Sequence, residues 1–171
     1  MVPVLSLSAN KQDVFHAVEA HLGQKSFRIV NRALDKPWGG FYVIDETQAR
    51  DFASYYFPEV DFNSLKITAN LSPKILVVAP NKRLSWQYHF RRAEIWRLVA
   101  GTAGITTSED DVERHSRELS MGEIVRLKQG ERHRLIGLET FGMIAEIWQH
   151  TDPLNPSDES DIVRVQDDFA R

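Results

Sequence analysis

The chain has 171 residues, 42% of them hydrophobic, which is enough for one ordinary domain with a sizeable core. With 21 basic and 24 acidic side chains the formal net charge is −3, whereas general nucleic-acid-binding proteins are usually strongly basic, so we expect no nucleic-acid partner. The absence of cysteine excludes disulfides and thiolate metal sites, and it favours a reducing, cytoplasmic location.

The N-terminus shows no targeting signal. Residues 1–11 lack a basic start and a long apolar run, so we expect no signal peptide. The longest apolar run, at 75–80, is far too short to cross a bilayer, so no membrane association is expected either.

Residues 10–23 are predicted to form one helix that packs against a core. Asn10 can cap its N-terminus, Asp13 suits the first turn because of the helix dipole, and Gly23 suits the C-cap. A second short helix is predicted over 47–56, before Pro58. One face of the first helix carries an apolar stripe of Val14, Val18 and Leu22.

Most of the remaining chain is predicted to form short strands. These segments are rich in β-branched and aromatic residues and are separated by Gly, Pro, Asn or charged turns. Many short, closely spaced strands are typical of a barrel or a jelly roll. The predicted strands are residues 27–32, 41–45, 74–79, 84–90, 93–100, 102–107, 122–128, 132–138, 141–148 and 161–165.

A group of possible metal ligands lies in residues 83–96. Gln87 and His89 share one face of a strand, and Glu94 can begin the next strand beside them. His133, on a later strand, would add a second imidazole. This donor set suits zinc, manganese, iron, nickel or cobalt. Taken singly, His89 could be an ordinary packed histidine and Glu94 an ion-pair partner of Arg91 or Arg92.

These residues occur in two spaced blocks. The first reads Gln87-x-His89, four residues, Glu94, six residues, then Gly101; the second reads Gly122, five residues, Lys128-x-Gly130, two residues, then His133. The blocks resemble the paired motifs of the cupin superfamily, Gly-x5-His-x-His-x(3,4)-Glu-x6-Gly and Gly-x5-Pro-x-Gly-x2-His-x3-Asn. The departures are Asn81 for the first Gly, Gln87 for a His, Lys128 for the Pro and Gly137 for the Asn.

The cupin resemblance implies both a fold and a cofactor. The implied fold is mainly all-β, a double-stranded β-helix or jelly-roll barrel over residues 36–171. Residues 1–35 would form an N-terminal helical extension, in a single domain overall. The cofactor would be one divalent metal ion, zinc first, with manganese, nickel, iron or cobalt as alternatives. Its implied ligands are Gln87, His89, Glu94 and His133.

Five segments narrow the resemblance further. Residues 36–45, 72–80, 84–96, 122–135 and 161–171 resemble the type II phosphomannose isomerase domain, whereas residues 1–35 and 46–71 lie outside the similarity. This resemblance implies the isomerisation of a sugar phosphate, such as mannose 6-phosphate to fructose 6-phosphate, through an enediolate. Lys36 replaces a family Arg, and Phe90, Arg91 and Ile95 replace three family histidines; Phe169 and Ala170 replace a Tyr-Gly pair.

The same resemblance assigns roles beyond the metal ligands. It implies that Arg92 steadies the substrate, and that Lys74 or Glu146 moves the proton once burial has tuned its pKa. Guanidinium groups bind phosphate bidentately, which suits a phosphate clamp. The implied substrate-binding residues are Arg91, Arg164, Arg171, Lys36 and Trp38. Two plainer alternatives stay open: the arginines pair with Asp161, Asp167 and Asp168, and Trp38 is a core aromatic.

Three other functions stay open at this point. The chain could be a non-catalytic cupin that binds a sugar or sugar phosphate, because one fold hosts many functions. It could be a metal-dependent oxygenase, although the basic residues argue against the apolar pocket that we expect there. The metal site could also remain without metal. By analogy with cupins, the N-terminal helix could support a homodimer.

Overall fold

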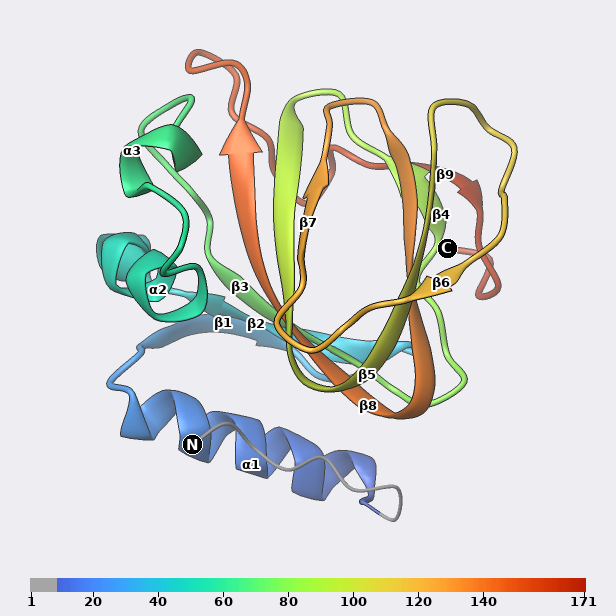
Figure 1. Cartoon of the computed structure of the whole chain (residues 1–171), viewed down its shortest axis with the longest axis horizontal. Coiled ribbons are helices and arrows are strands. Elements are labelled where there is room, and N and C mark those ends of the chain that lie inside the picture. Colours follow the sequence, from blue (N-terminus) through green and yellow to red (C-terminus); the bar gives the residue numbers. More distant parts are fainter. Residues whose placement is uncertain (1–8) are drawn as a thin grey trace.

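The computed structural model describes residues 9–171 and shows a curled antiparallel sheet with helices packed against one side (Figure 1). The expectation about a signal peptide falls mainly on residues 1–8, which lie outside the described residues. Within residues 9–171, no helix is long and apolar enough to span a membrane. In chain order the elements are α1 (Lys11–Gln24), β1 (Ile29–Ala33), β2 (Gly39–Ile44), the 3-10 helix η1 (Glu46–Gln48), α2 (Ala49–Tyr56), α3 (Phe62–Leu65), β3 (Lys74–Val78), β4 (Trp86–Tyr88), β5 (Arg92–Ser108), β6 (Arg117–Glu118), β7 (Ile124–Leu127), β8 (Arg132–His150) and β9 (Val163–Gln166).

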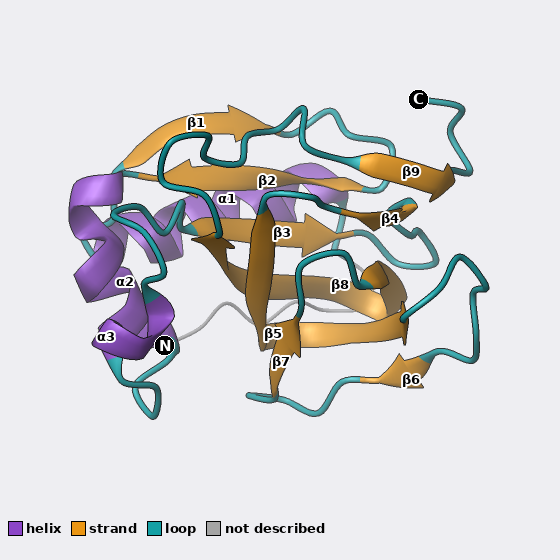
Figure 2. Ribbon diagram, turned by 90° about the horizontal axis from the view of Figure 1, so that it is seen from above, coloured by secondary structure: helices purple, strands orange, loops and turns teal. Residues whose placement is uncertain are grey.

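One long strand pair organises the sheet. The strands lie in the order β1, β2, β3, β8, β4, β9, and β5 pairs with β8 on one side and with β6 and β7 on the other. The β5–β8 ladder runs from Arg92 opposite His150 to Ser108 opposite Arg132. Both strands curve together through the molecule (Figures 1 and 2). In the described part of the chain β1 and β9 lie at the two ends of this order, so the sheet curls without closing into a barrel.

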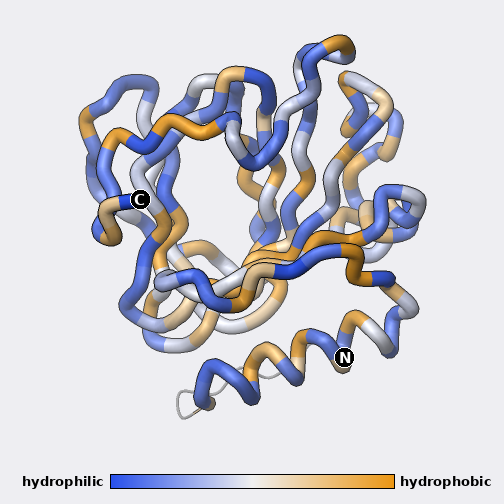
Figure 3. The backbone as a smooth tube through the Cα atoms, turned by 180° about the vertical axis from the view of Figure 1, so that it is seen from behind, coloured by the Kyte–Doolittle hydropathy of each residue, from blue (hydrophilic) through white to orange (hydrophobic). Residues whose placement is uncertain are grey.

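Side chains alternate between two hydrophobic cores along the central strands, as the pleat of a strand requires. On β3, Ile75 and Val77 pack in an outer core that also contains Val18 of α1, whereas Leu76 and Val78 pack in an inner core on the opposite face. Figure 3 shows the hydrophobic stretches of the sheet running above α1. The inner face of the sheet is therefore the face available for a site.

The first predicted helix is confirmed, except at its end. The Asn10 side chain accepts a hydrogen bond from the Asp13 N–H at 2.9 Å, as an N-cap should. Gly23 is not the C-cap, because the helix continues to Gln24 and Lys25 occupies that position. The residue with left-handed backbone after this helix is Ser26, at φ 60°, and not a glycine. The second predicted helix is split into η1 and α2.

Four segments that were predicted as separate strands form two continuous strands. Residues 93–100 and 102–107 both belong to β5, and residues 132–138 and 141–148 both belong to β8. Gly101, at φ +70°, does not end its strand; register shifts flank it and bend the ladder instead. Two very short elements, α3 and β6, were not predicted. Strand β1 lies within residues 1–35, the stretch that we had assigned to the extension.

Candidate metal centre

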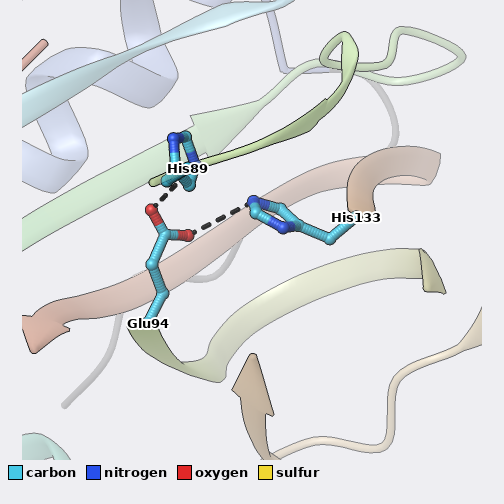
Figure 4. A group of neighbouring side chains, drawn as sticks. All are labelled: His89, Glu94 and His133. Atoms are coloured by element: carbon cyan, nitrogen blue, oxygen red, sulfur yellow. Dashed lines mark ion pairs between the residues drawn. The ribbon is translucent and has the colours of Figure 1, made fainter. Parts of the chain in front are cut away.

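Three of the four predicted ligands meet on the inner face of the sheet. His89 follows β4, Glu94 lies in β5 and His133 lies in β8, and their donor atoms all lie within 4.8 Å of one another. The Nε2 atom of His89 is 3.2 Å from Glu94 Oε1, and that of His133 is 3.4 Å from Glu94 Oε2 (Figure 4). Each residue is only 2% exposed. The pairing of β5 with β8 and of β4 with β8 brings these distant positions together.

Backbone carbonyls orient both imidazoles toward the carboxylate. His89 Nδ1 lies 2.6 Å from the carbonyl oxygen of Asp161, and His133 Nδ1 lies 3.0 Å from that of Glu131. A carbonyl can only accept, so each Nδ1 carries the proton and each Nε2 offers a lone pair toward Glu94. This arrangement is typical of metal-binding histidines.

The charge states also fit a cation. Burial lowers the pKa of His89 to about 4 and lowers the pKa of His133 as well, so both rings are neutral near pH 7. Burial alone would raise the pKa of Glu94, but the surrounding His89, Arg92 and His133 lower it, so its carboxylate is ionised. His133 Nε2 is buried without a hydrogen-bond partner in the described structure, as expected of an atom that awaits a ligand. The donor set therefore fits a borderline divalent ion.

Gln87, the fourth predicted ligand, lies beside this group. It faces His133 across the β4–β8 pair, and it lines the same cavity as Glu94. Its Oε1 accepts a hydrogen bond from Ser85 Oγ at 2.5 Å, which leaves one lone pair of that oxygen available.

Arg92 touches the same atoms. Its Nε donates to Glu94 Oε1 at 2.7 Å, and its Nη2 lies 3.1 Å from His89 Nε2. The guanidinium stacks on the Trp148 ring at 3.6 Å from the ring centre and is 5% exposed. Arg92 thus places a fixed positive charge at the edge of the candidate metal centre.

A cavity of about 220 Å³ reaches this centre at Gln87 and Glu94, whereas His89 and His133 do not line it. Its lining combines aromatic walls, supplied by Trp38, Phe41 and the indoles of β5 and β8, with charged groups. Trp38 lines the cavity and is also part of the inner hydrophobic core, so its role as a core aromatic is confirmed and its role in substrate binding stays a prediction. The cavity brings together most of the predicted site residues: Lys36, Trp38, Lys74, Gln87, Arg92, Glu94, Glu146, Arg164 and Arg171.

Glu146 is the most perturbed acid in this cavity. It is 4% exposed and accepts hydrogen bonds from the indole N–H groups of Trp96 and Trp148, both at 3.0 Å. Burial and the negative charge of Glu94 raise its pKa, against the opposing effect of Lys74. Glu146 therefore holds a proton more tightly than an ordinary carboxyl group, which suits a group that exchanges protons near neutrality.

Lys74 is a buried ammonium group opposite Glu146. The two residues pair across β3 and β8, and Lys74 Nζ lies 3.5 Å from the centre of the Trp148 ring. Its ammonium forms an ion pair with Glu159, whose side chain is 65% exposed on the loop between β8 and β9. A buried cation is thus held by an aromatic face and by an acid that solvent can reach.

Three basic residues that are more exposed than the metal centre also line the cavity. Lys36 and Arg164 make no side-chain hydrogen bond or ion pair within residues 9–171, whereas Arg171 pairs bidentately with Asp167, at 2.9 and 2.8 Å. The alternative that the tail arginines are structural ties therefore holds for Arg171 and not for Arg164.

Arg91, predicted to bind substrate, does not line the cavity. Its guanidinium instead donates to Asn155 and to the carbonyl of Pro156, both at 2.8 Å, and approaches Asp158 at 3.3 Å. The other two positions that replace family histidines also lie outside the cavity lining: Phe90 is 60% exposed and Ile95 is packed in the outer core.

Four residues that shape the site had no predicted role in it: Trp96, Trp148, Glu159 and Asp161. Strict alternation along β5 and β8 places Trp96 on the face of Glu94 and Trp148 on the face of Glu146, so that signal was present. Asp161 begins the family-like segment 161–171 but was considered only as an ion-pair partner of the arginines, and no local pattern marks Glu159.

Comparisons with known proteins agree with this picture. Residues 48–167 match the family described as mannose-6-phosphate isomerase C-terminal. A mannose-1-phosphate guanylyltransferase of Salmonella montevideo is 30% identical over 161 residues, which is 94% of this chain and 28% of that protein. The xanthan biosynthesis protein XanB of Xanthomonas campestris is 31% identical over 121 residues, 68% of this chain and 23% of that protein. The chain thus spans about a quarter of the length of these relatives.

Solved structures support the fold. The capsular polysaccharide assembling protein CapF of Staphylococcus aureus has a TM-score of 0.52 at 16% identity, covering 78% of this chain and 33% of that one. Oxalate decarboxylase of Bacillus subtilis has a TM-score of 0.54 at 14% identity, covering 78% and 29%. At this level of identity the likeness concerns the fold alone, and it confirms the mainly β cupin fold expected from the two motif blocks.

Proposed function

The chain belongs to the mannose-6-phosphate isomerase C-terminal family, and from this premise we propose that it interconverts the aldose and ketose forms of a sugar phosphate, with mannose 6-phosphate as the first candidate. One observation carries the proposal. Glu94, the carboxylate of the His-Glu-His ligand set, lines one cavity together with a buried carboxyl group of raised pKa and several basic side chains. The Salmonella montevideo relative is named for mannose 1-phosphate, which agrees with a sugar-phosphate substrate.

The ligand set defines where a cofactor would act. A divalent ion, with zinc as first choice, held by His89, Glu94 and His133 with Gln87 as a fourth donor, would polarise the substrate carbonyl and stabilise the negative charge that develops on its oxygens. Because the set contains a single carboxylate, net positive charge remains at the site. When His89 Nε2 serves as a ligand, it gives up its contact with Arg92, and one N–H of that guanidinium is freed beside the cavity.

We assign the proton transfer to Glu146. Isomerisation requires removal of a proton from the carbon next to the carbonyl, delivery of a proton to the neighbouring carbon, and a matching proton shift between the two oxygens. The indole N–H groups of Trp96 and Trp148 hold the carboxylate of Glu146 in place, and Lys74 stabilises it once the proton has left. Burial keeps its affinity for the proton high enough for the return step.

The phosphate group would bind at the outer part of the cavity. Lys36 and Arg164 carry positive charges there without a side-chain partner within the described part of the chain, and Arg171 adds a guanidinium that Asp167 already orients. Such groups can clamp a phosphate directly. The charged lining also disfavours the apolar substrates that we expect of an oxygenase on this fold.

The test is proton exchange in heavy water. Purified, metal-loaded protein incubated with mannose 6-phosphate should introduce deuterium at the carbon beside the carbonyl and produce fructose 6-phosphate, and His133→Ala should do neither. Binding of the sugar phosphate without any label in it, across the common hexose and pentose phosphates, would replace the isomerase proposal with a binding protein. Oxygen consumption would replace it with an oxygenase.

A further inference from the structure

We propose that Asp161 is a positioning residue: it holds the turn after β4 so that His89 presents Nε2 to the metal centre. This proposal rests on the proposed metal-binding function and concerns a residue that is not itself a ligand. Asp161 lies 72 positions beyond His89 in the chain, in the segment that precedes β9.

Asp161 contacts four consecutive residues of the turn. Its carbonyl oxygen accepts from His89 Nδ1 at 2.6 Å, and from Arg92 Nη1 at 3.4 Å. Its carboxylate oxygens accept the backbone N–H groups of Phe90 and Arg91, both at 3.0 Å. One residue therefore satisfies the backbone of the turn and also fixes the imidazole beside it.

Only an ionised carboxylate suits this position. Asp161 is 5% exposed, and Ser157 Oγ donates to it at 2.6 Å in addition to the two backbone N–H groups. Burial would raise the pKa of Asp161, but these hydrogen bonds outweigh burial and lower it. An asparagine offers a single acceptor oxygen, so its NH₂ group would face one of the three donors and push it away.

The carboxylate and the carbonyl have separate tasks. The carboxylate fixes residue 161 against the turn, and this places the carbonyl where it can hold the proton of His89 on Nδ1. A second tie supports the same loop, because the Ser157 N–H donates to His150 Nδ1 at 3.0 Å. The loop between β8 and β9 thus sets the tautomer of a ligand that follows β4, the strand that lies between them.

The test compares Asp161→Asn and Asp161→Ala with wild type in the metal-free state. Nitrogen NMR of the histidine rings should show His89 protonated on Nδ1 in wild type and a mixture of tautomers in both variants. His133 is an internal control, because Glu131 and not Asp161 holds its Nδ1. Its signal should stay unchanged. Asp168→Asn is the matched variant, since Asp168 pairs with Arg83 and does not touch the turn.

The second readout is affinity for zinc or manganese, measured by calorimetry. Loss of such an orienting contact typically lowers affinity about 10- to 100-fold. We expect this decrease in both Asp161 variants and not in Asp168→Asn. An unchanged His89 tautomer in the variants would overturn the proposal, and so would equal disturbance of His89 and His133. Because the ring signals are recorded without metal or substrate, failure of the isomerase assay leaves this test intact.

Discussion

Glu94 and Glu146 accept hydrogen bonds from the same indole nitrogen, Trp96 Nε1, at 3.1 and 3.0 Å. Their pKa values nevertheless move in opposite directions. Burial would raise the pKa of Glu94, but its neighbours Arg92, His89 and His133 lower it. Burial and the negative charge of Glu94 raise the pKa of Glu146. Two carboxyl groups tuned apart in this way can take different roles. Glu94 is suited to bind a cation, and Glu146 is suited to carry a proton.

The first prediction concerns the proton carrier. Glu146→Gln keeps the shape of the side chain and removes its basicity, so deuterium exchange into the substrate should fall at least about 100-fold. Bound metal should stay at the wild-type level, because Glu146 is not among the clustered donors. In wild type the exchange rate should rise with pH as this carboxyl group loses its proton. Exchange that survives in Glu146→Gln would transfer the role to Lys74.

The second prediction concerns metal content. Purified protein should hold about one divalent ion per chain, because His89, Glu94 and His133 form one cluster of donors. His89→Ala and His133→Ala should each abolish binding in metal analysis, and added metal should then no longer raise the melting temperature. His115→Ala, an exposed histidine outside the cavity, is the matched control. Equal metal content in all three variants would contradict the site.

The third prediction concerns access to Lys74. Its ion pair with Glu159 must open before an anionic ligand can use this ammonium. Partly exposed ion pairs contribute up to about 1 kcal/mol, so Glu159→Gln should strengthen binding of inorganic phosphate about 2- to 5-fold in calorimetry. Glu109→Gln breaks an exposed pair with Lys128 and should change nothing. Weaker phosphate binding in Glu159→Gln would mean that Glu159 helps to hold the ligand.

The fourth prediction compares two glycines of the motif blocks. Gly101 and Gly130 both have a positive φ, +70° and +78°. A Cβ on Gly101 would lie 1.7 Å from the carbonyl oxygen of Phe141, whereas a Cβ on Gly130 meets nothing within 4 Å. Gly130→Ala should therefore lower the free energy of unfolding by only about 1–2 kcal/mol, the cost of the left-handed conformation. Gly101→Ala should lower it by more than about 4 kcal/mol, measured by urea unfolding.

The fifth prediction concerns acid stability without metal. The pKa of His89 falls from 6.5 to about 4 on burial, so between these values the unfolded chain binds a proton that the folded one does not. The free energy of unfolding should therefore decrease as pH falls through this window. His89 alone contributes up to about 3 kcal/mol, and His133 acts in the same direction. His89→Gln should flatten the slope in urea unfolding measured at several pH values.

The two spaced motif blocks were sufficient to find the cluster of His89, Glu94 and His133. They are short patterns whose ligands lie close to strand ends, so register within each block fixes where the side chains point. The motif blocks did not reveal that Arg91 lies outside the cavity lining. Its sequence position matches a family histidine, but a loop more than sixty residues away captures its guanidinium.

Long-range loop contacts explain most of what the sequence did not reveal. Asp161 and Glu159 reach the site from a loop without regular structure, so neither strand alternation nor helical spacing marks them. Some of the predicted strand boundaries were wrong for a different reason. One strand was predicted to end before Gly101 and another to begin after it. A glycine with a positive φ can instead bend a strand that stays paired with its neighbour.

The curvature of β8 has a consequence for how this family could change its substrate. His133 and Glu146 belong to the same strand and would lie about 40 Å apart if it were straight. In the structure three successive contacts of 3.4, 3.1 and 3.0 Å join them through Glu94 and Trp96. The distance between His133 and Glu146 thus depends on a bend in the β5–β8 ladder. The register shifts of this bend lie between Leu98 and Ala103, away from the metal centre. Remodelling that bend would change the distance between the metal ligands and Glu146 without replacing any of these residues.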